Sequence, residues 1–295
     1  MSAYALSACS TADHPRSFFE ERDILCTLFH YQMDGEIFAD DLYESITPAA
    51  FFEKIMAGSE PTTSQPAAGE YAATWEPHLQ AGEDILHVSL SSGISGAYNS
   101  ACIARDQLTA AYPDRRIIVI DSLAASAGYG MLLEYLADLR DAGQGIEEVA
   151  AWAEEHKLEL NSWFYVSDLE CLKRGGRVSK TSALIATALK ICPVLDIDAA
   201  GHLIPRAKIR TKKKAMAELA RICAERIEDG ASYQGRCCIS HSDCREDAEE
   251  VARLVSERIP TLSGKIGIYN IGTVIGSHTG PGTVALFFMG EPRRA

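Results

Sequence analysis

The sequence contains no Cys-x-x-Cys pair, although nine cysteines are scattered along it. The missing spacing argues against a zinc ribbon and against a thioredoxin-like redox motif. The eight histidines are equally dispersed, with no pair four residues apart, so no metal site is expected. Adjacent Cys237 and Cys238 lie in an apolar, strand-like run, which is typical of buried thiols. Reduced thiols indicate a cytoplasmic protein.

Long apolar runs and positive charge are also scarce. No stretch approaches the roughly 18 apolar residues of a membrane helix, and the N-terminus lacks a basic segment followed by a long apolar run. With 28 basic and 41 acidic residues, the formal net charge is −13. This balance argues against general nucleic-acid binding and against electrostatic docking on anionic membranes. We therefore expect no nucleic-acid partner and no integral membrane segment.

The patterns that are present indicate an α/β fold. Apolar residues make up 47% of the 295 positions, which is enough for a sizeable core. Short runs typical of β-strands alternate with segments of helical periodicity. The expected strands are residues 84–90, 116–122, 162–168, 192–198, 202–210, 236–242 and 265–271. The expected helices are residues 95–112, 124–143, 145–160, 211–228 and 245–259.

These elements divide into two predicted domains with a boundary near residue 160. Residues 1–160 would form an N-terminal α/β domain, a parallel sheet wrapped by helices. Residues 161–295 would form a C-terminal α/β domain with a mixed sheet. In a parallel sheet, ligands gather outside the carboxyl ends of the strands. Ser91 to Gly96 follow one such end, so this loop is a candidate for ligand binding.

Three loops rich in hydroxyl groups stand out: "EPTTSQP" at 60–66, "SLSSGISGAYNS" at 89–100 and "TVIGSHTGPG" at 273–282. Each loop alone has an ordinary explanation as a turn or helix N-cap, because Ser, Thr and Gly are favoured there. The third is predicted to be a glycine-rich turn carrying His278. That histidine could be a catalytic base, a metal ligand or a hydrogen-bond donor to an anion.

An acyl hydrolase is one alternative, because "GISGA" nearly matches the G-x-S-x-G nucleophile elbow, with Ala97 replacing the last glycine. Ser95 would be the nucleophile and His278 the base. However, an elbow places its serine directly after the strand, whereas Ser95 lies five residues beyond the strand-like run. No acidic partner for His278 can be identified either. "KRGGRVS" at 173–179 lacks the Walker spacing, so only its arginines are informative.

Four motifs taken in order match a known family. "TTSQP", "SLSSGISGAYNSA", "LECLKRGGRVSK" and "IGTVIGSHTGPGTVALFF" resemble the DegV family of bacterial fatty-acid-binding proteins, some of which are carrier subunits of a fatty acid kinase. The resemblance covers nearly the whole chain, with "KICPVLDIDAAGHLIPRAKIRTKKKA" as the family's central stretch. The chain departs from the family at its N-terminus, where Cys9 stands in place of the usual aspartate of an Asp–Ser pair.

The resemblance implies a carrier that binds a long-chain fatty acid such as palmitate, stearate or oleate between the two domains, with no cofactor and no catalysis of its own. The carboxylate would be bound by Thr63, Ser95 and His278. A buried carboxylate needs a donor for nearly every lone pair, and charge-assisted hydrogen bonds are the strong ones. The weaker candidates for contact with the head group or a phosphate are Ser64, Ser92, Gly96, Arg174, Arg177 and Thr279. The tunnel walls would come from residues 181–191 and 284–288.

The run of basic residues from Arg206 to Lys214 is unusual in a chain of this charge. It is either a solvated surface or a docking site for the partner kinase, through Lys208, Arg210 and Lys212. The predicted function is non-covalent fatty acid binding and presentation of the carboxylate to a kinase. The alternatives are the Ser95–His278 hydrolase and a lipid-sensing regulatory protein.

Overall fold

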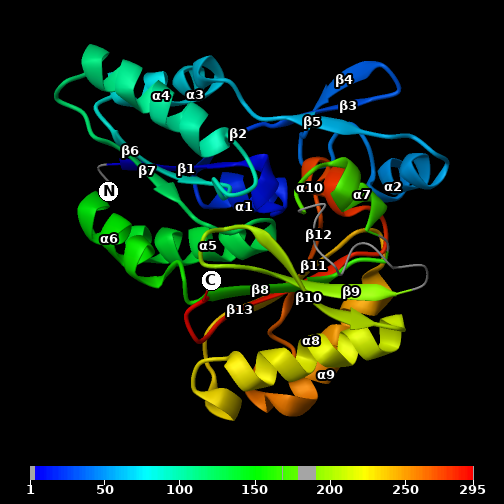
Figure 1. Ribbon diagram of the computed structural model, residues 1–295. Helices are drawn as coiled ribbons and strands as arrows, with labels where there is room; N and C mark the ends of the chain where they lie inside the picture. Colours follow the sequence, from blue (N-terminus) through cyan, green and yellow to red (C-terminus); the bar gives the residue numbers. More distant parts are fainter. Residues whose placement is uncertain (1–3, 168, 179–190, 295) are drawn as a thin grey trace.

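The computed structural model describes residues 4–167, 169–178 and 191–294, and Figure 1 shows their arrangement. Four parallel strands form the first sheet, in the order β2-β1-β6-β7. Their side chains are buried on both faces, as expected of a parallel sheet covered by helices. The strands are β1 (Tyr4–Cys9), β2 (Ile24–Thr27), β6 (Asp84–Ser89) and β7 (Ile117–Asp121).

Helices cover both faces of this sheet. α3 (Ala68–Gln80) and α4 (Ala97–Ala111) lie side by side on one face, and α6 (Ile146–His156) packs against the other (Figure 1). In α4 the buried residues recur every three or four positions, as amphipathic periodicity requires. The predicted parallel sheet with helices around it is confirmed. The short α1 (Arg16–Glu21) follows a single 3-10 turn at Ser10–Ala12 and packs against β2.

The second sheet has six strands in the order β10-β9-β8-β13-β11-β12. Only the β11–β12 pair is parallel, so the predicted mixed sheet is confirmed. The strands are β8 (Leu160–Tyr165), β9 (Cys192–Ile197), β10 (Leu203–Ile209), β11 (Cys237–His241), β12 (Gly267–Asn270) and β13 (Val284–Met289). The helices α8 (Lys212–Arg226) and α9 (Arg245–Arg258) pack together on one face (Figure 1). Short 3-10 turns at Gly230–Ser232 and Pro260–Leu262 complete this part of the chain.

α5 (Ala127–Asp141) packs on the other face of the six-stranded sheet, against β8, β11 and β13, and also contacts α6. The helix therefore links the two sheets, although its residues fall within the predicted N-terminal domain. The boundary near residue 160 remains a prediction. Among the described helices, none is long and apolar enough to span a bilayer.

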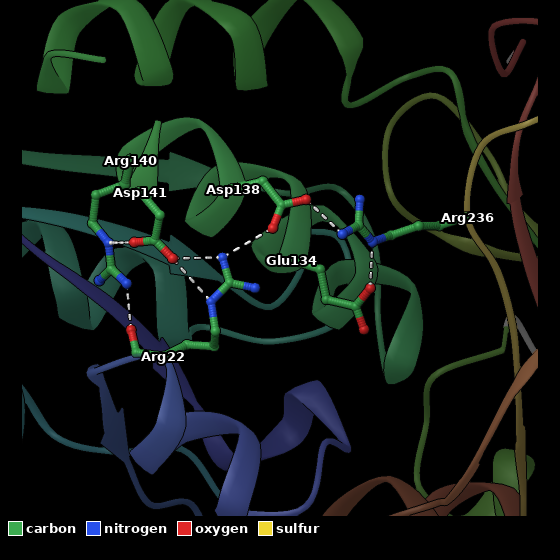
Figure 2. A network of polar contacts seen from close by, with 6 residues as sticks. All are labelled: Arg22, Glu134, Asp138, Arg140, Asp141 and Arg236. Atoms are coloured by element: carbon green, nitrogen blue, oxygen red, sulfur yellow. Dashed lines mark hydrogen bonds and ion pairs between the residues drawn. The ribbon is translucent and has the colours of Figure 1, made fainter. Parts of the chain in front are cut away.

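Charged side chains on α5 reach two segments that are distant in sequence (Figure 2). Arg22, at the end of α1, pairs with Asp138 at 2.9 Å and with Asp141 at 2.8 Å. Arg236, just before β11, pairs with Glu134 at 2.7 Å and with Asp138 at 2.5 Å. These groups are partly exposed, so each pair stabilises the fold only modestly. The network joins α5 to both segments in addition to its packing.

A third, antiparallel sheet in the order β4-β3-β5 was not expected from the sequence. It consists of β3 (His30–Met33), β4 (Glu36–Ala39) and β5 (Thr62–Ser64). Asp34 and Gly35 both have positive φ angles, 54° and 88°, as a tight two-residue hairpin turn requires. The sheet packs with α2 (Pro48–Met56) around a small separate core. The Asp-Gly turn between alternating residues was the sequence signal for this hairpin.

The segment around His278 also differs from its prediction. Residues Thr273–Thr279 form a short helix, α10, and the turn begins only at Gly280. Two carboxylates hold the start of this helix, so a segment rich in glycine and β-branched residues becomes helical through tertiary contacts. α10 packs against α7 (Glu170–Arg174), α2 and β5.

Candidate head-group site and acyl cavity

A cavity lies between the loops at the carboxyl ends of β6 and β7 and one face of the six-stranded sheet. The space not filled by protein atoms is about 720 Å³, counting the part that opens to solvent. Most of its lining is apolar. The apolar lining side chains are Phe29, Leu90, Ile94, Ala125, Phe164, Leu172, Ile197, Leu203, Ile271, Val274, Ile275, Ala285 and Phe287.

Thr63 and His278 meet at this cavity. The Thr63 hydroxyl on β5 lies 2.8 Å from Nε2 of His278, which stands at the end of α10. The other ring nitrogen, Nδ1, is buried and has no hydrogen-bond partner among the described residues. Gly175 leaves room for the ring, because a Cβ at that position would lie 2.2 Å from Nδ1. Burial, and secondly the charge of Arg177, lowers the pKa of His278 to about 4, so the imidazole is neutral at pH 7.

Ser95 lines the same cavity from the loop before α4. Its hydroxyl accepts a hydrogen bond from the backbone N–H of Ala97 at 3.2 Å. The hydroxyl hydrogen is thus available to a ligand. No hydrogen bond joins Ser95 to His278, and within the described residues no carboxylate contacts the His278 ring. The geometry of a catalytic triad is therefore not formed here.

Arg177 and Thr279 complete the polar lining near His278. The Arg177 guanidinium donates from Nε to the carbonyl of Ile94 at 3.1 Å and from Nη1 to the carbonyl of Gly175. Burial lowers the pKa of this guanidinium, which nevertheless stays charged. The Thr279 hydroxyl donates to the carbonyl of Ile275 at 3.2 Å. Among the lining side chains that the structure describes, Arg177 is thus the one with a formal positive charge.

Four of the weaker candidates lie outside the cavity. Ser64 and Ser92 are exposed, and the backbone N–H of Ser92 donates to Asp121. Gly96 lines an outer groove that shares Ser95 and Arg177 with the cavity. Arg174 is exposed and pairs with Glu60 at 3.0 Å.

The predicted tunnel walls are only partly described. Ala285 and Phe287 of the segment 284–288 line the cavity. Residues 181–190 of the other predicted wall lie outside the described residues.

Two buried carboxylates that the sequence analysis missed hold the start of α10. Asp13 accepts from the backbone N–H of Gly272 at 2.9 Å, and Asp40 accepts from the hydroxyl of Thr273 at 2.7 Å. Burial raises the pKa of both carboxyls. Asp13 also accepts from Ser126, which lines the cavity with a strained φ of 57°. These contacts position the helix that carries His278.

Cys9, the departure from the family pattern, does not line the cavity. Its thiol lies 3.2 Å from the hydroxyl of Tyr71 in the core of the first sheet. Burial raises the pKa of Cys9 to about 12, so the thiol is neutral. Within the described part of the chain, no three His, Cys, Asp or Glu side chains gather as a metal site would require.

The chain matches known proteins over almost its whole length. The family model described as "Uncharacterised protein, DegV family" matches residues 8–291. A DegV domain-containing protein of Clostridium perfringens is 38% identical over 293 residues, which is 99% of both chains. A structure described as "Fatty Acid Binding of a DegV family Protein from Thermus thermophilus" superposes with a TM-score of 0.86 at 28% identity, over 98% of this chain and 100% of that one. A DegV lipid binding protein of Thermotoga maritima gives a TM-score of 0.85 at 29% identity, over 99% of each chain. The chain belongs to the DegV family.

Proposed function

We propose that this protein binds one long-chain fatty acid non-covalently, with its acyl chain in the cavity and its carboxylate at Thr63, Ser95 and His278. The proposal rests on one observation: an apolar cavity is lined at one place by the hydroxyls of Thr63 and Ser95 and by the His278 ring that contacts Thr63. The relatives described as fatty-acid-binding and lipid-binding DegV proteins support the same class of ligand.

The hydrogen-bond geometry suits a carboxylate if the His278 proton is on Nε2, because Nδ1 faces Gly175. Nε2–H then donates to the Thr63 hydroxyl, whose own hydrogen is available to a ligand oxygen. The Ser95 hydroxyl supplies a second donor. Arg177, already bonded to two carbonyls, contributes positive charge close by. A carboxylate held mainly by neutral donors can be released more readily than one locked in a buried ion pair.

The acyl chain would supply most of the affinity. At about 0.8 kcal/mol per buried methylene, a sixteen-carbon chain contributes on the order of 10 kcal/mol before the cost of association is subtracted. Palmitate, stearate and oleate each have a long acyl chain that can supply affinity in this way.

We further propose that the bound carboxylate is presented to an ATP-dependent kinase, as the family resemblance implies. The basic stretch is the proposed docking surface, but part of its charge is already compensated. Lys212 pairs with Asp247 at 2.8 Å, and Arg206 pairs with Asp196 at 2.8 Å. Arg210 would therefore carry more of the docking than Lys212, and Lys208 is exposed as well. All nine cysteines are free thiols, which supports a reducing compartment such as the cytoplasm.

A carrier and a hydrolase respond differently to loss of the Ser95 hydroxyl. We expect Ser95→Ala to weaken fatty acid binding roughly tenfold, the cost of one hydrogen bond to a charged group. Wild type should show no turnover of acyl esters, because no triad is formed. Titration of delipidated protein with palmitate and an ester-hydrolysis assay measure the two effects. Ester turnover that disappears in both Ser95→Ala and His278→Ala would instead establish the hydrolase.

A further inference from the structure

The hydroxyl of Ser162 is a buried polar group that fatty acid binding alone does not explain. Ser162 lies on β8, lines the cavity and is only 2% exposed. Its Oγ has no hydrogen-bond partner among the described residues. Buried hydroxyls in folded proteins are nearly always paired, because an unpaired one is unfavourable. A ligand in the cavity could supply the hydrogen-bond partner that Ser162 lacks.

The other hydroxyls of the lining have partners within the protein. Ser126 donates to Asp13. Thr279 donates to a carbonyl of its own helix, and Thr283 donates to the carbonyl of Thr279 at 3.0 Å. Among the described lining side chains, only two buried polar atoms lack a partner: Nδ1 of His278 and Oγ of Ser162. Nδ1 faces the backbone of Gly175, so the Ser162 Oγ is the atom of the two that a ligand in the cavity can reach.

Along β8, Ser162 lies farther than Phe164 from the strand end that leads to α7 and His278. After β8 the chain leads to α7 and then to Gly175, which abuts the His278 ring. Ser162 precedes Phe164, another lining residue, by two positions on the strand, or about 7 Å in the direction away from α7. Across the sheet it pairs with Phe287. The Ser162 hydroxyl thus lies beside the acyl chain rather than beside the carboxylate.

The surroundings of this hydroxyl limit what can pair with it. Gly128 of α5 stands against it, since a Cβ there would lie 3.2 Å from the Ser162 Oγ and 2.7 Å from the ring of Phe287. With Phe164 and Phe287 on the same face, the neighbourhood is apolar. A trapped water needs two to four polar partners, and the side chains of Phe164 and Phe287 and the residue Gly128 provide no side-chain donor or acceptor. A carbon–carbon double bond accepts only a weak hydrogen bond.

We infer that the cavity selects long-chain fatty acids that carry a hydroxyl group along the acyl chain, and that Ser162 is the specificity-determining residue. A ligand hydroxyl can both donate to and accept from the Ser162 Oγ, which satisfies both groups at once. The inference rests on the proposed function, because it assumes that the acyl chain lies in this cavity. One hydrogen bond gained in a buried site corresponds to about a tenfold gain in affinity.

The test compares ligands on one delipidated protein. Stearate, oleate and a series of hydroxystearates, with the hydroxyl at successive carbons, are titrated into wild type, Ser162→Ala and the control Ser167→Ala. Ser167 follows β8, is exposed and does not line the cavity. We expect wild type and the control to bind one hydroxystearate isomer about tenfold more tightly than stearate. In Ser162→Ala this preference should vanish, while stearate binding stays equal or improves.

The outcomes separate this inference from the function on which it rests. If stearate binds wild type but no hydroxystearate isomer is preferred, or if the preference survives in Ser162→Ala, the inference is overturned and fatty acid binding stands. If Ser162→Ala changes only the ratio of oleate to stearate, the selected group is a double bond and the inference is equally overturned. If no fatty acid binds wild type, the proposed function fails and the inference fails with it.

Discussion

Replacement of Gly175 by alanine is expected to weaken fatty acid binding by roughly tenfold to a hundredfold while the protein stays folded. The backbone of Gly175 has φ −69° and ψ −11°, which alanine adopts without strain. Its new Cβ, however, would lie 2.2 Å from Nδ1 and 3.1 Å from Cε1 of His278. The ring must move, which breaks its 2.8 Å contact with Thr63, the hydroxyl donor proposed for the carboxylate.

The neighbouring glycine supplies the control. Gly176 has a φ of +68°, but a Cβ there would meet nothing within 4 Å. Gly176→Ala should therefore cost about 1 kcal/mol of stability through backbone strain and leave the affinity for fatty acid unchanged. Calorimetric titration with palmitate and thermal unfolding of both variants separate the two effects. Wild-type affinity in Gly175→Ala would contradict the assigned role of His278.

Acid is expected to destabilise the fold through His87, which is fully buried in the core of the first sheet. Its Nδ1 lies 3.0 Å from the hydroxyl of Ser7, and its Nε2 has no described partner. Burial lowers the pKa of His87 from 6.5 to about 3. The unfolded chain therefore takes up a proton on this histidine at a higher pH than the folded chain does. The stabilising contribution is fully present above pH 6.5 and is lost as the pH falls toward 3.

For His87 the expected loss is about 1.4 kcal/mol of unfolding free energy per pH unit between roughly pH 6 and pH 4. His87→Asn, which keeps an acceptor for the Ser7 hydroxyl, should lack this dependence. Urea unfolding of both proteins across this range measures the difference. Asp13 and Asp40 titrate in both proteins, so their contributions cancel. A wild-type minus variant difference that stays constant with pH would show that His87 does not titrate as proposed.

The sequence predicted the parts of the fold in which periodicity and burial agree. The strands around residues 84–90 and 116–122, and the amphipathic helix between them, are in place because each satisfies its own hydrophobic pattern. The sheet of β3, β4 and β5 was missed because its strands have only three or four residues, although the Asp34–Gly35 turn marks the β3–β4 hairpin. α10 was missed for another reason. Its start is held by Asp13 and Asp40, which are more than 200 positions away in the chain.

Residues of the candidate site could be predicted where a family motif contains them. Which side chains are buried at the cavity could not be predicted from the sequence. Thr63, Ser95 and His278 come from three separate segments, and the structure gathers all three around one cavity. Ser64, Ser92 and Arg174 belong to the same motifs, but their side chains point elsewhere or pair with other residues. Ser162 lies in an unremarkable strand. Its unpaired hydroxyl can be recognised only once its neighbours in space are known.

The most direct test of the account is to purify the protein, denature it, extract it with organic solvent and identify the lipid by mass spectrometry. The apolar cavity and the donors at its end predict close to one long-chain fatty acid per protein chain. The same extraction from His278→Ala should recover less, because the Thr63 hydroxyl loses the partner that orients it toward the carboxylate. Recovery of no lipid from wild type, together with no binding of added palmitate or oleate, would contradict fatty acid binding itself.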